Sequence, residues 1–333
     1  MAGDGRVMIE TQGLTKDFGD FRAVDDVTLN VEAGTVLALL GPNGAGKTTT
    51  VRMMTSILKP TAGSARIAGY DVTTQPVEVR QNVGVLTEQH GLYERMRPLE
   101  YLDFFARLYH LDAQTRRKRA KALMERFGLA DAYGKRLGEF SKGMKQKLAL
   151  VRAMLHDPPV LLLDEPTSAM DPQSAKLVRD SILELRRDAH TFIVTTHNLN
   201  EAQLLADRIA IIRQGRIIAE GTFEELSRRF VGVPTMELRV RVPLNGLVQE
   251  ISDMVEVIGY GDHWLRYRVE QPEITNPHLL RRLTSLGVDV ITLSPLQETL
   301  EAIYLRIVAE DEQVEHDNGS IPRYADAIAS TSP

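Results

Sequence analysis

The chain has 333 residues, 43% of them hydrophobic, which is enough for two globular domains with substantial cores. A formal net charge of −5 gives no general reason to expect nucleic acid binding, and the absence of cysteine excludes disulfides, thiolate metal sites and cysteine catalysis. No apolar run approaches the ~20 residues of a membrane span, and the first residues lack a signal-peptide pattern, so we expect a cytoplasmic protein.

Two alternating segments near the start, Val7–Thr11 and Val24–Val31, predict strands, with a turn at Thr15–Gly19 between them. The turn carries Phe18, whose ring could stack on an adenine base. The alternative is a ring packed against an edge sheet, and the sequence alone favours that alternative.

A glycine-rich loop stands between a buried strand, Thr35–Leu40, and a helix, Thr50–Leu58. Its glycines let backbone N–H groups surround phosphate oxygens, and the helix N-terminus adds partial positive charge. Lys47 would reach the β- and γ-phosphates, and the Thr48 hydroxyl would hold Mg²⁺. The sequence therefore predicts a triphosphate site built from Gly41, Pro42, Asn43, Gly44, Ala45, Gly46, Lys47, Thr48 and Thr49.

Gln89 follows a short strand candidate, Val83–Leu86. An amide at the end of a buried strand can contact Mg²⁺ or the attacking water, although a loop glutamine taken alone usually has no such role. From Pro98 to about Leu155 the apolar spacing is helical. The basic cluster Arg116–Lys121 in this stretch lacks interleaved aromatic residues, so we interpret it as a solvated helix face and expect no nucleic acid partner.

Ser141 stands at the start of the next helix, where its ordinary role is an N-cap. A second possibility is that its hydroxyl and the Gly143 N–H contact a phosphate at this helix terminus.

Two further strands are expected to end in polar residues at one edge of the sheet. The apolar run after Pro159 ends in Asp164 and Glu165, and the run Thr191–Thr196 ends at His197. Asp164 would hold Mg²⁺ through water or Thr48, and Glu165 would be the general base that polarises the attacking water. His197, at the same edge, predicts a γ-phosphate contact.

Over residues 7 to about 230, the order of these segments resembles that of ATP-binding subunits of ABC transporters. The matching motifs are Walker A at Gly41–Thr49, Walker B with the catalytic glutamate at Leu161–Glu165, the Q-loop at Gln89, the D-loop from Ser168 to Asp171, the switch histidine at His197 and the adenine-stacking aromatic at Phe18.

The family's signature motif appears here with a departure. The usual Leu-Ser-Gly-Gly-Gln stands as Phe140-Ser141-Lys142-Gly143-Met144. Ser141 and Gly143, which face phosphate in the family, are kept. The form with Lys142 and Met144 is similar to that of ABC-2-type exporters related to drug-resistance and sodium-efflux ATPases.

The resemblance implies an α/β P-loop NTPase domain with an antiparallel edge subdomain and a helical subdomain at about 90–155. It implies ATP and Mg²⁺ as ligands, with Thr48, Gln89 and Asp164 at the metal and Glu165, His197 and Gln89 in catalysis. ATP would be bound head to tail between two copies, or between this chain and a paralogous ATPase subunit, with Ser141 and Gly143 on the partner's nucleotide. A separate membrane-spanning permease would place the pair at the inner face of the cell membrane.

The remainder predicts a second, smaller domain at 235–309 and an acidic tail at 310–333. Strand and helix patterns follow in the order βαββαβ, with the first helix at Leu244–Asp253, and a last helix closes the domain. This order suggests a ferredoxin-like α+β fold, and it resembles the accessory domain that often follows the ATPase in ABC-2-type subunits. The tail lacks apolar periodicity, and we expect it to be disordered.

Three functions remain open at this point. The leading one is the energising subunit of an exporter. A soluble ABC ATPase acting on ribosomes or DNA is the alternative, but ribosomal relatives carry two cassettes, and DNA-repair relatives insert long coiled coils between the Walker motifs. Here only 164 − 47 = 117 positions separate Lys47 from Asp164, and they contain no heptads. A nucleotide-binding regulator with weak turnover is the third, and Glu165 with His197 argues against it.

Overall fold

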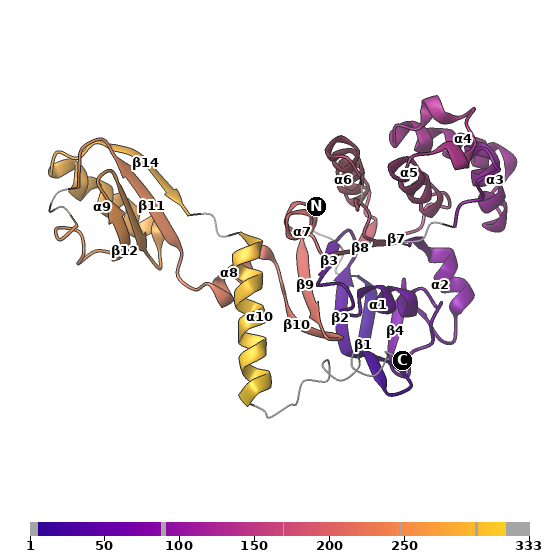
Figure 1. The fold of residues 1–333 in the computed structure, drawn as a ribbon, viewed down its shortest axis with the longest axis horizontal. Helices are drawn as coiled ribbons and strands as arrows, with labels where there is room; N and C mark the ends of the chain where they lie inside the picture. The colour runs from indigo at the N-terminus through magenta and orange to yellow at the C-terminus, as the bar shows by residue number, and fades with distance from the viewer. Residues whose placement is uncertain are drawn as a thin grey trace, which may run out of the picture. The chain divides into compact units, whose positions relative to one another are not determined.

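The computed structural model describes residues 6–87, 91–168, 170–244, 246, 248–296 and 299–317. The chain divides into two compact units, residues 1–223 and 224–333. Figure 1 shows the elements of each unit. Among the described residues, no helix is both long and apolar enough to cross a bilayer.

The first unit is built on a six-stranded sheet of order β10-β9-β3-β8-β7-β6. All neighbours pair in parallel except β9 and β10, which form a hairpin around Gln214 and Gly215. The central strands are rich in apolar residues and buried along their whole length, as parallel strands between helices require. The strands are β3 (Val36–Leu40), β6 (Val83–Leu86), β7 (Val160–Asp164), β8 (Thr191–Thr196), β9 (Arg208–Arg213) and β10 (Arg216–Gly221).

A four-stranded antiparallel sheet of order β2-β1-β4-β5 accompanies it. Its strands are β1 (Val7–Phe18), β2 (Phe21–Glu32), β4 (Ala62–Ile67) and β5 (Tyr70–Asp71). Side chains of both sheets and of α1 (Lys47–Met54) form one buried cluster, to which Leu14, Leu39 and Met53 belong. The helix after the glycine-rich loop is therefore fixed by apolar contacts on two sides. A short helix, α2 (Pro76–Asn82), precedes β6.

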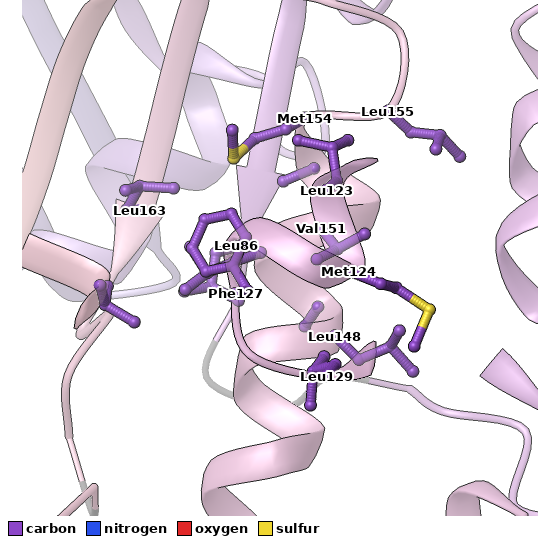
Figure 2. Close-up of a cluster of buried hydrophobic side chains, with 14 of the residues drawn as sticks. Leu86, Leu123, Met124, Phe127, Leu129, Leu148, Val151, Met154, Leu155 and Leu163 are labelled. Atoms are coloured by element: carbon purple, nitrogen blue, oxygen red, sulfur yellow. The ribbon is translucent and has the colours of Figure 1, made fainter. Parts of the chain in front are cut away.

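The helical stretch forms α3 (Pro98–Leu108), α4 (Ala113–Arg126) and α5 (Lys142–Ala153), with two short 3₁₀ turns before α5. These three helices gather together in Figure 1, apart from β1, β2 and β4. Figure 2 shows the cluster that joins them to the central sheet, where Phe127 and Leu148 pack with Leu86 of β6 and Leu163 of β7. One apolar cluster thus joins α5 to the sheet that contains the strand ending in Asp164. Two further helices are α6 (Pro172–Arg187) and α7 (Leu199–Leu205).

The second unit contains an antiparallel sheet of order β12-β13-β11-β14 with its own buried cluster. The strands are β11 (Thr235–Val240), β12 (Glu256–Gly261), β13 (Trp264–Arg268) and β14 (Val290–Pro295), and α9 spans Pro272–Ser285. The helix predicted at Leu244–Asp253 is wrong, because the described residues there form turns. Gly246, with a φ of 77°, lies in this segment and disfavours a helix. The ferredoxin-like assignment stays a prediction.

The last described helix, α10 (Leu300–Asp317), corrects part of the predicted disorder. Residues 310–317 continue the helix, because glutamate and glutamine are good helix formers even where apolar periodicity ends. The rest of the tail lies outside the described residues. The start of α10 has a buried face of Leu300, Ile303 and Ile307. Arg306 of α10 donates to the Phe230 carbonyl at the end of α8 (Phe223–Phe230), at 3.4 Å.

Candidate nucleotide-binding and catalytic site

Three neighbouring strands bring the predicted site residues to one edge of the central sheet. Leu40 of β3 pairs with Thr196 of β8, and Thr195 of β8 pairs with Asp164 of β7. The glycine-rich loop, Glu165 and His197 follow these strand ends directly. Parallel strands that end in register explain why segments more than a hundred residues apart meet here.

The glycine-rich loop is shaped by backbone that only glycine permits. Gly46 has a φ of 105°, and a Cβ on it would lie 2.7 Å from the Ala23 carbonyl oxygen. A Cβ on Gly41 would lie 2.2 Å from the Ile212 carbonyl oxygen. The Gly41 N–H also donates to the Thr196 carbonyl at 3.2 Å, which fixes the loop to the strand that precedes His197.

Lys47 is a buried cation at the first position of α1. Its Nζ donates to the carbonyl oxygens of Gly41, at 2.6 Å, and Pro42, at 3.0 Å, and lies 4.0 Å from Glu165 Oε1. Burial lowers the pKa of Lys47, and the carboxylates of Glu165 and Asp164 oppose that shift. An anionic phosphate would therefore meet an ammonium group that has little water around it, where ionic hydrogen bonds are strong.

Asp164 is held between two hydroxyl groups at the end of β7. Thr48 Oγ1 donates to Asp164 Oδ2 at 2.9 Å, and Thr195 Oγ1 donates to the other carboxylate oxygen. Asp164 is buried, and its carboxylate with the Thr48 hydroxyl forms an oxygen set of the kind that Mg²⁺ prefers. The two residues predicted to hold Mg²⁺ are thus hydrogen-bonded to each other.

Glu165 and His197 form a second polar pair. His197 Nδ1 lies 2.8 Å from Glu165 Oε1, and an ionised carboxylate can only accept, so Nδ1 carries the hydrogen in this pair. Glu165 has a φ of 51°, a left-handed backbone that costs a non-glycine residue roughly 1–3 kcal/mol. Strain of this kind persists only where the surroundings enforce it, and it is concentrated at functional sites.

The remaining predicted residues have clear positions, apart from Gln89, which lies outside the described residues. Phe18 ends β1 with 48% of its surface exposed, so its ring is not packed into the sheet, and Lys16 Nζ lies 5.2 Å from its centroid. Ser141 caps α5, since its hydroxyl accepts from the Met144 N–H at 3.2 Å. The N-cap interpretation of Ser141 is therefore confirmed.

The signature stretch begins α5, and the D-loop residue Asp171 stands at the start of α6. Lys142 is exposed, and the nearest atom to a Cβ built on Gly143 is Met170 Cγ at 4.0 Å, so the backbone of Gly143 is open to close approach. Asp171 caps α6 by accepting from the Ser174 N–H at 2.9 Å. Ser168 donates its N–H to the Glu165 carbonyl at 3.2 Å.

Sequence reasoning missed two buried side chains that contact this machinery. Glu201, in α7, accepts from the hydroxyls of Thr196, at 2.7 Å, and of Thr167. Burial raises the pKa of the Glu201 carboxyl, and the two hydroxyls partly offset this. Gln146, in α5, donates to the carbonyls of Glu165 and Pro166. The sequence signal that could have found them is their closeness to predicted site residues, since Glu201 stands four residues after His197 and Gln146 five after Ser141.

Comparison with known proteins identifies the family of this chain. The family model for ABC transporters matches residues 24–168. The chain is 36% identical over 307 residues to the daunorubicin resistance ATP-binding protein DrrA3 of Streptomyces coeruleorubidus, covering 92% of this chain and 97% of that protein. It is 43% identical over 206 residues to the ABC transporter ATP-binding protein NatA of Bacillus subtilis, covering 62% of this chain and 84% of NatA.

Solved structures give the same result. A structure of the ATP-binding subunit of an ABC transporter has a TM-score of 0.64 at 31% identity, covering 68% of this chain and 94% of that chain. The dimeric ATP-binding cassette MJ0796 bound to ADP and phosphate has a TM-score of 0.61 at 25% identity, covering 65% of this chain and 98% of that chain. The protein belongs to the ABC transporter family, as an ATP-binding and ATP-hydrolysing subunit.

Proposed function

We propose that this protein powers an exporter of the ABC-2 type by hydrolysing ATP beside a separate membrane-spanning permease. The observation that carries the proposal is the convergence of Lys47, Asp164, Glu165 and His197 at the ends of three adjacent strands. The likeness to a drug-resistance ATP-binding protein over 92% of this chain supports export. Residues 7–230 are proposed as the ATPase domain, and residues 235–309 as an accessory domain.

The triphosphate is proposed to lie in the loop Gly41–Thr49, with its β- and γ-phosphates on Lys47. Lys47 then exchanges its bonds to loop carbonyls for charge-assisted bonds to phosphate. Thr48 and Asp164 are proposed to hold Mg²⁺ together with Gln89, and the bound metal would neutralise charge on the phosphates. Phe18, exposed at the end of β1, is proposed to stack on the adenine.

Glu165 is proposed as the general base for the attacking water. Its carboxylate already accepts from His197, which holds one oxygen in place and leaves the other available for the proton of water. His197 would contact the γ-phosphate from the same side. The chemistry is positioning and charge stabilisation, with no covalent intermediate on the protein.

A second nucleotide-binding subunit is proposed to complete each site. Ser141 and Gly143 at the start of α5 would contact the partner's triphosphate, with Lys142 and Met144 beside them and the D-loop residues Ser168 and Asp171 at the same interface. The dimeric structure of MJ0796 with ADP and phosphate supports this arrangement by similarity. ATP would close the pair, and hydrolysis would open it.

The permease is proposed to contact the helical stretch between β6 and β7. Tyr93, Phe104 and Leu108 are 51%, 41% and 59% exposed there. Tyr93 and Phe104 meet edge to face, with ring centroids 6.0 Å apart. An exposed aromatic cluster of this kind suits a protein interface, and it would hold the subunit peripherally at the inner face of the membrane.

The test is Glu165→Gln in the purified full-length chain, with exposed Glu224→Gln as the control. We expect ATP turnover to fall by about 100-fold or more, because the amide cannot accept a proton. ATP binding should persist, and a dimer should accumulate with ATP, visible by size-exclusion chromatography. Wild-type turnover in Glu165→Gln would show that Glu165 is not the base.

A further inference from the structure

The main chain at Glu165 is held from two directions. Its N–H donates to the Thr195 carbonyl at 3.1 Å, within the sheet. Its carbonyl accepts from Gln146 Nε2 at 2.7 Å and from the Ser168 N–H at 3.2 Å. These contacts lie on both sides of a residue whose φ is 51°, a region that side chains with a Cβ rarely adopt.

Gln146 is suited to hold this turn. It is 2% exposed, and its amide nitrogen lies 2.7 Å from the carbonyl oxygens of both Glu165 and Pro166. An amide NH₂ has two hydrogens, so it can donate to both carbonyls at once. These carbonyls belong to two successive peptide groups, Glu165–Pro166 and Pro166–Thr167. Fixing both limits the backbone rotation by which the strained conformation would relax.

We propose that Gln146 is a positioning residue that holds Glu165 in its left-handed conformation and thereby places the base. This inference rests on the proposed role of Glu165. Gln146 lies in the helix that starts at Ser141, so the base of one site is tied to the helix that presents the signature stretch to the other nucleotide. A shift of α5 when Ser141 meets a triphosphate would be transmitted to Glu165 through two hydrogen bonds.

The experiment compares Gln146→Met with wild type in the full-length chain, using steady-state ATP hydrolysis. Methionine keeps the length and volume of the side chain and removes both donors. We expect kcat to fall about tenfold or more, which is the effect of about 1.4 kcal/mol on the barrier. KM for ATP should stay within about twofold, because the phosphates are held by the loop Gly41–Thr49. The exposed Gln114→Met in α4 is the matched control and should leave kcat unchanged.

A double variant separates positioning from a general loss of structure. Because Gln146 acts through Glu165, adding Gln146→Met to Glu165→Gln should slow the residual turnover no further. Gln146→Asn, whose amide is one carbon short of the carbonyls, should also lower kcat, and it serves if the methionine variant does not fold.

Either folded Gln146 variant with wild-type kcat overturns the inference, and so does an equal further loss in the Glu165→Gln background. If Glu165→Gln is inactive while Gln146→Met is fully active, the positioning role of Gln146 is wrong and the proposed role of Glu165 stands. If Glu165→Gln itself turns over at the wild-type rate, the proposed base is at fault.

Discussion

Glu201 is a buried acidic side chain near the catalytic pair. It is 4% exposed, and its carboxylate joins Thr167, which follows Glu165 by two positions, to Thr196, which directly precedes His197. The hydroxyls on both sides fix the relative position of two segments that each carry a catalytic residue. Burial raises the pKa of Glu201, so the folded state holds this proton to a higher pH than the unfolded state does.

This shift predicts a pH dependence of stability that Glu201→Gln should remove. The folded state keeps the proton above the ordinary glutamate pKa of 4.5, whereas the unfolded state releases it. Wild-type stability therefore falls as pH rises from 4.5 through the raised pKa, and the neutral variant avoids this loss. The measurement is thermal unfolding of both proteins at pH 5 and pH 8. The melting temperature of Glu201→Gln minus that of wild type should be larger at pH 8 than at pH 5 by at least about 2 °C.

Exposed Glu224→Gln is the control, and its difference from wild type should not change between the two pH values. An equal difference for Glu201→Gln at both pH values would show that the carboxyl does not titrate in this range.

Residues with local motifs were predictable, and residues with distant partners were not. Lys47 and Thr48 stand inside a loop whose glycine spacing reveals the chemistry, and Asp164 ends an aliphatic run. Gln146 gains its importance from partners 19 and 20 positions away, and Glu201 links Thr196 to Thr167, which is 34 positions away; no periodicity encodes these distant contacts. Only the register of β7 and β8 and the packing of α5 bring these partners together.

At the scale of elements, hydrophobic periodicity located the strands and helices that fix the site. The strands β3, β7 and β8 each carry an apolar run, and the structure buries all three strands completely. Leu123 and Met124 of α4, with Phe127 at its C-cap, are buried in the cluster of Figure 2, in the stretch whose apolar spacing predicts helices. In these elements local pattern and tertiary burial agree.

The predictions of elements were wrong where the local hydrophobic pattern and the backbone preferences of the residues disagree. The turn predicted at Thr15–Gly19 is wrong in extent, because β1 continues to Phe18 through irregular pairing with β2. Register shifts of this kind absorb polar residues and Gly13 into a strand without regular alternation. Residues 310–317 show the reverse case, in which helix propensity outweighs the missing apolar stripe.

At the scale of the whole molecule, two units have separate buried clusters. The first unit has two clusters, which surround α1 and α5, and the second has one, which includes Leu238, Leu265 and Leu279. The cluster of the second unit shares no residue with the two clusters of the first unit, so each unit has a hydrophobic core of its own.

We therefore expect two unfolding transitions by calorimetry. Mg-ATP should raise the midpoint temperature of only one of them, because a ligand stabilises the unit that binds it. Leu265→Ala removes a fully buried side chain from the second unit and should cost about 2–5 kcal/mol there. Leu265→Ala should lower the midpoint temperature of the transition that does not respond to nucleotide, and it should leave the midpoint of the other transition unchanged. A single transition that moves as a whole with both nucleotide and Leu265→Ala would show that the units unfold together.

The central claim is that the buried ammonium of Lys47 binds a triphosphate in the glycine-rich loop. The most direct measurement is calorimetric titration of Lys47→Ala and wild type with Mg-ATP, with the exposed Lys121→Ala as the control. We expect affinity to fall by roughly 100-fold, since a desolvated ionic bond to phosphate is worth about 3 kcal/mol. The control should bind as wild type does. Unchanged affinity and unchanged hydrolysis in Lys47→Ala would contradict the account.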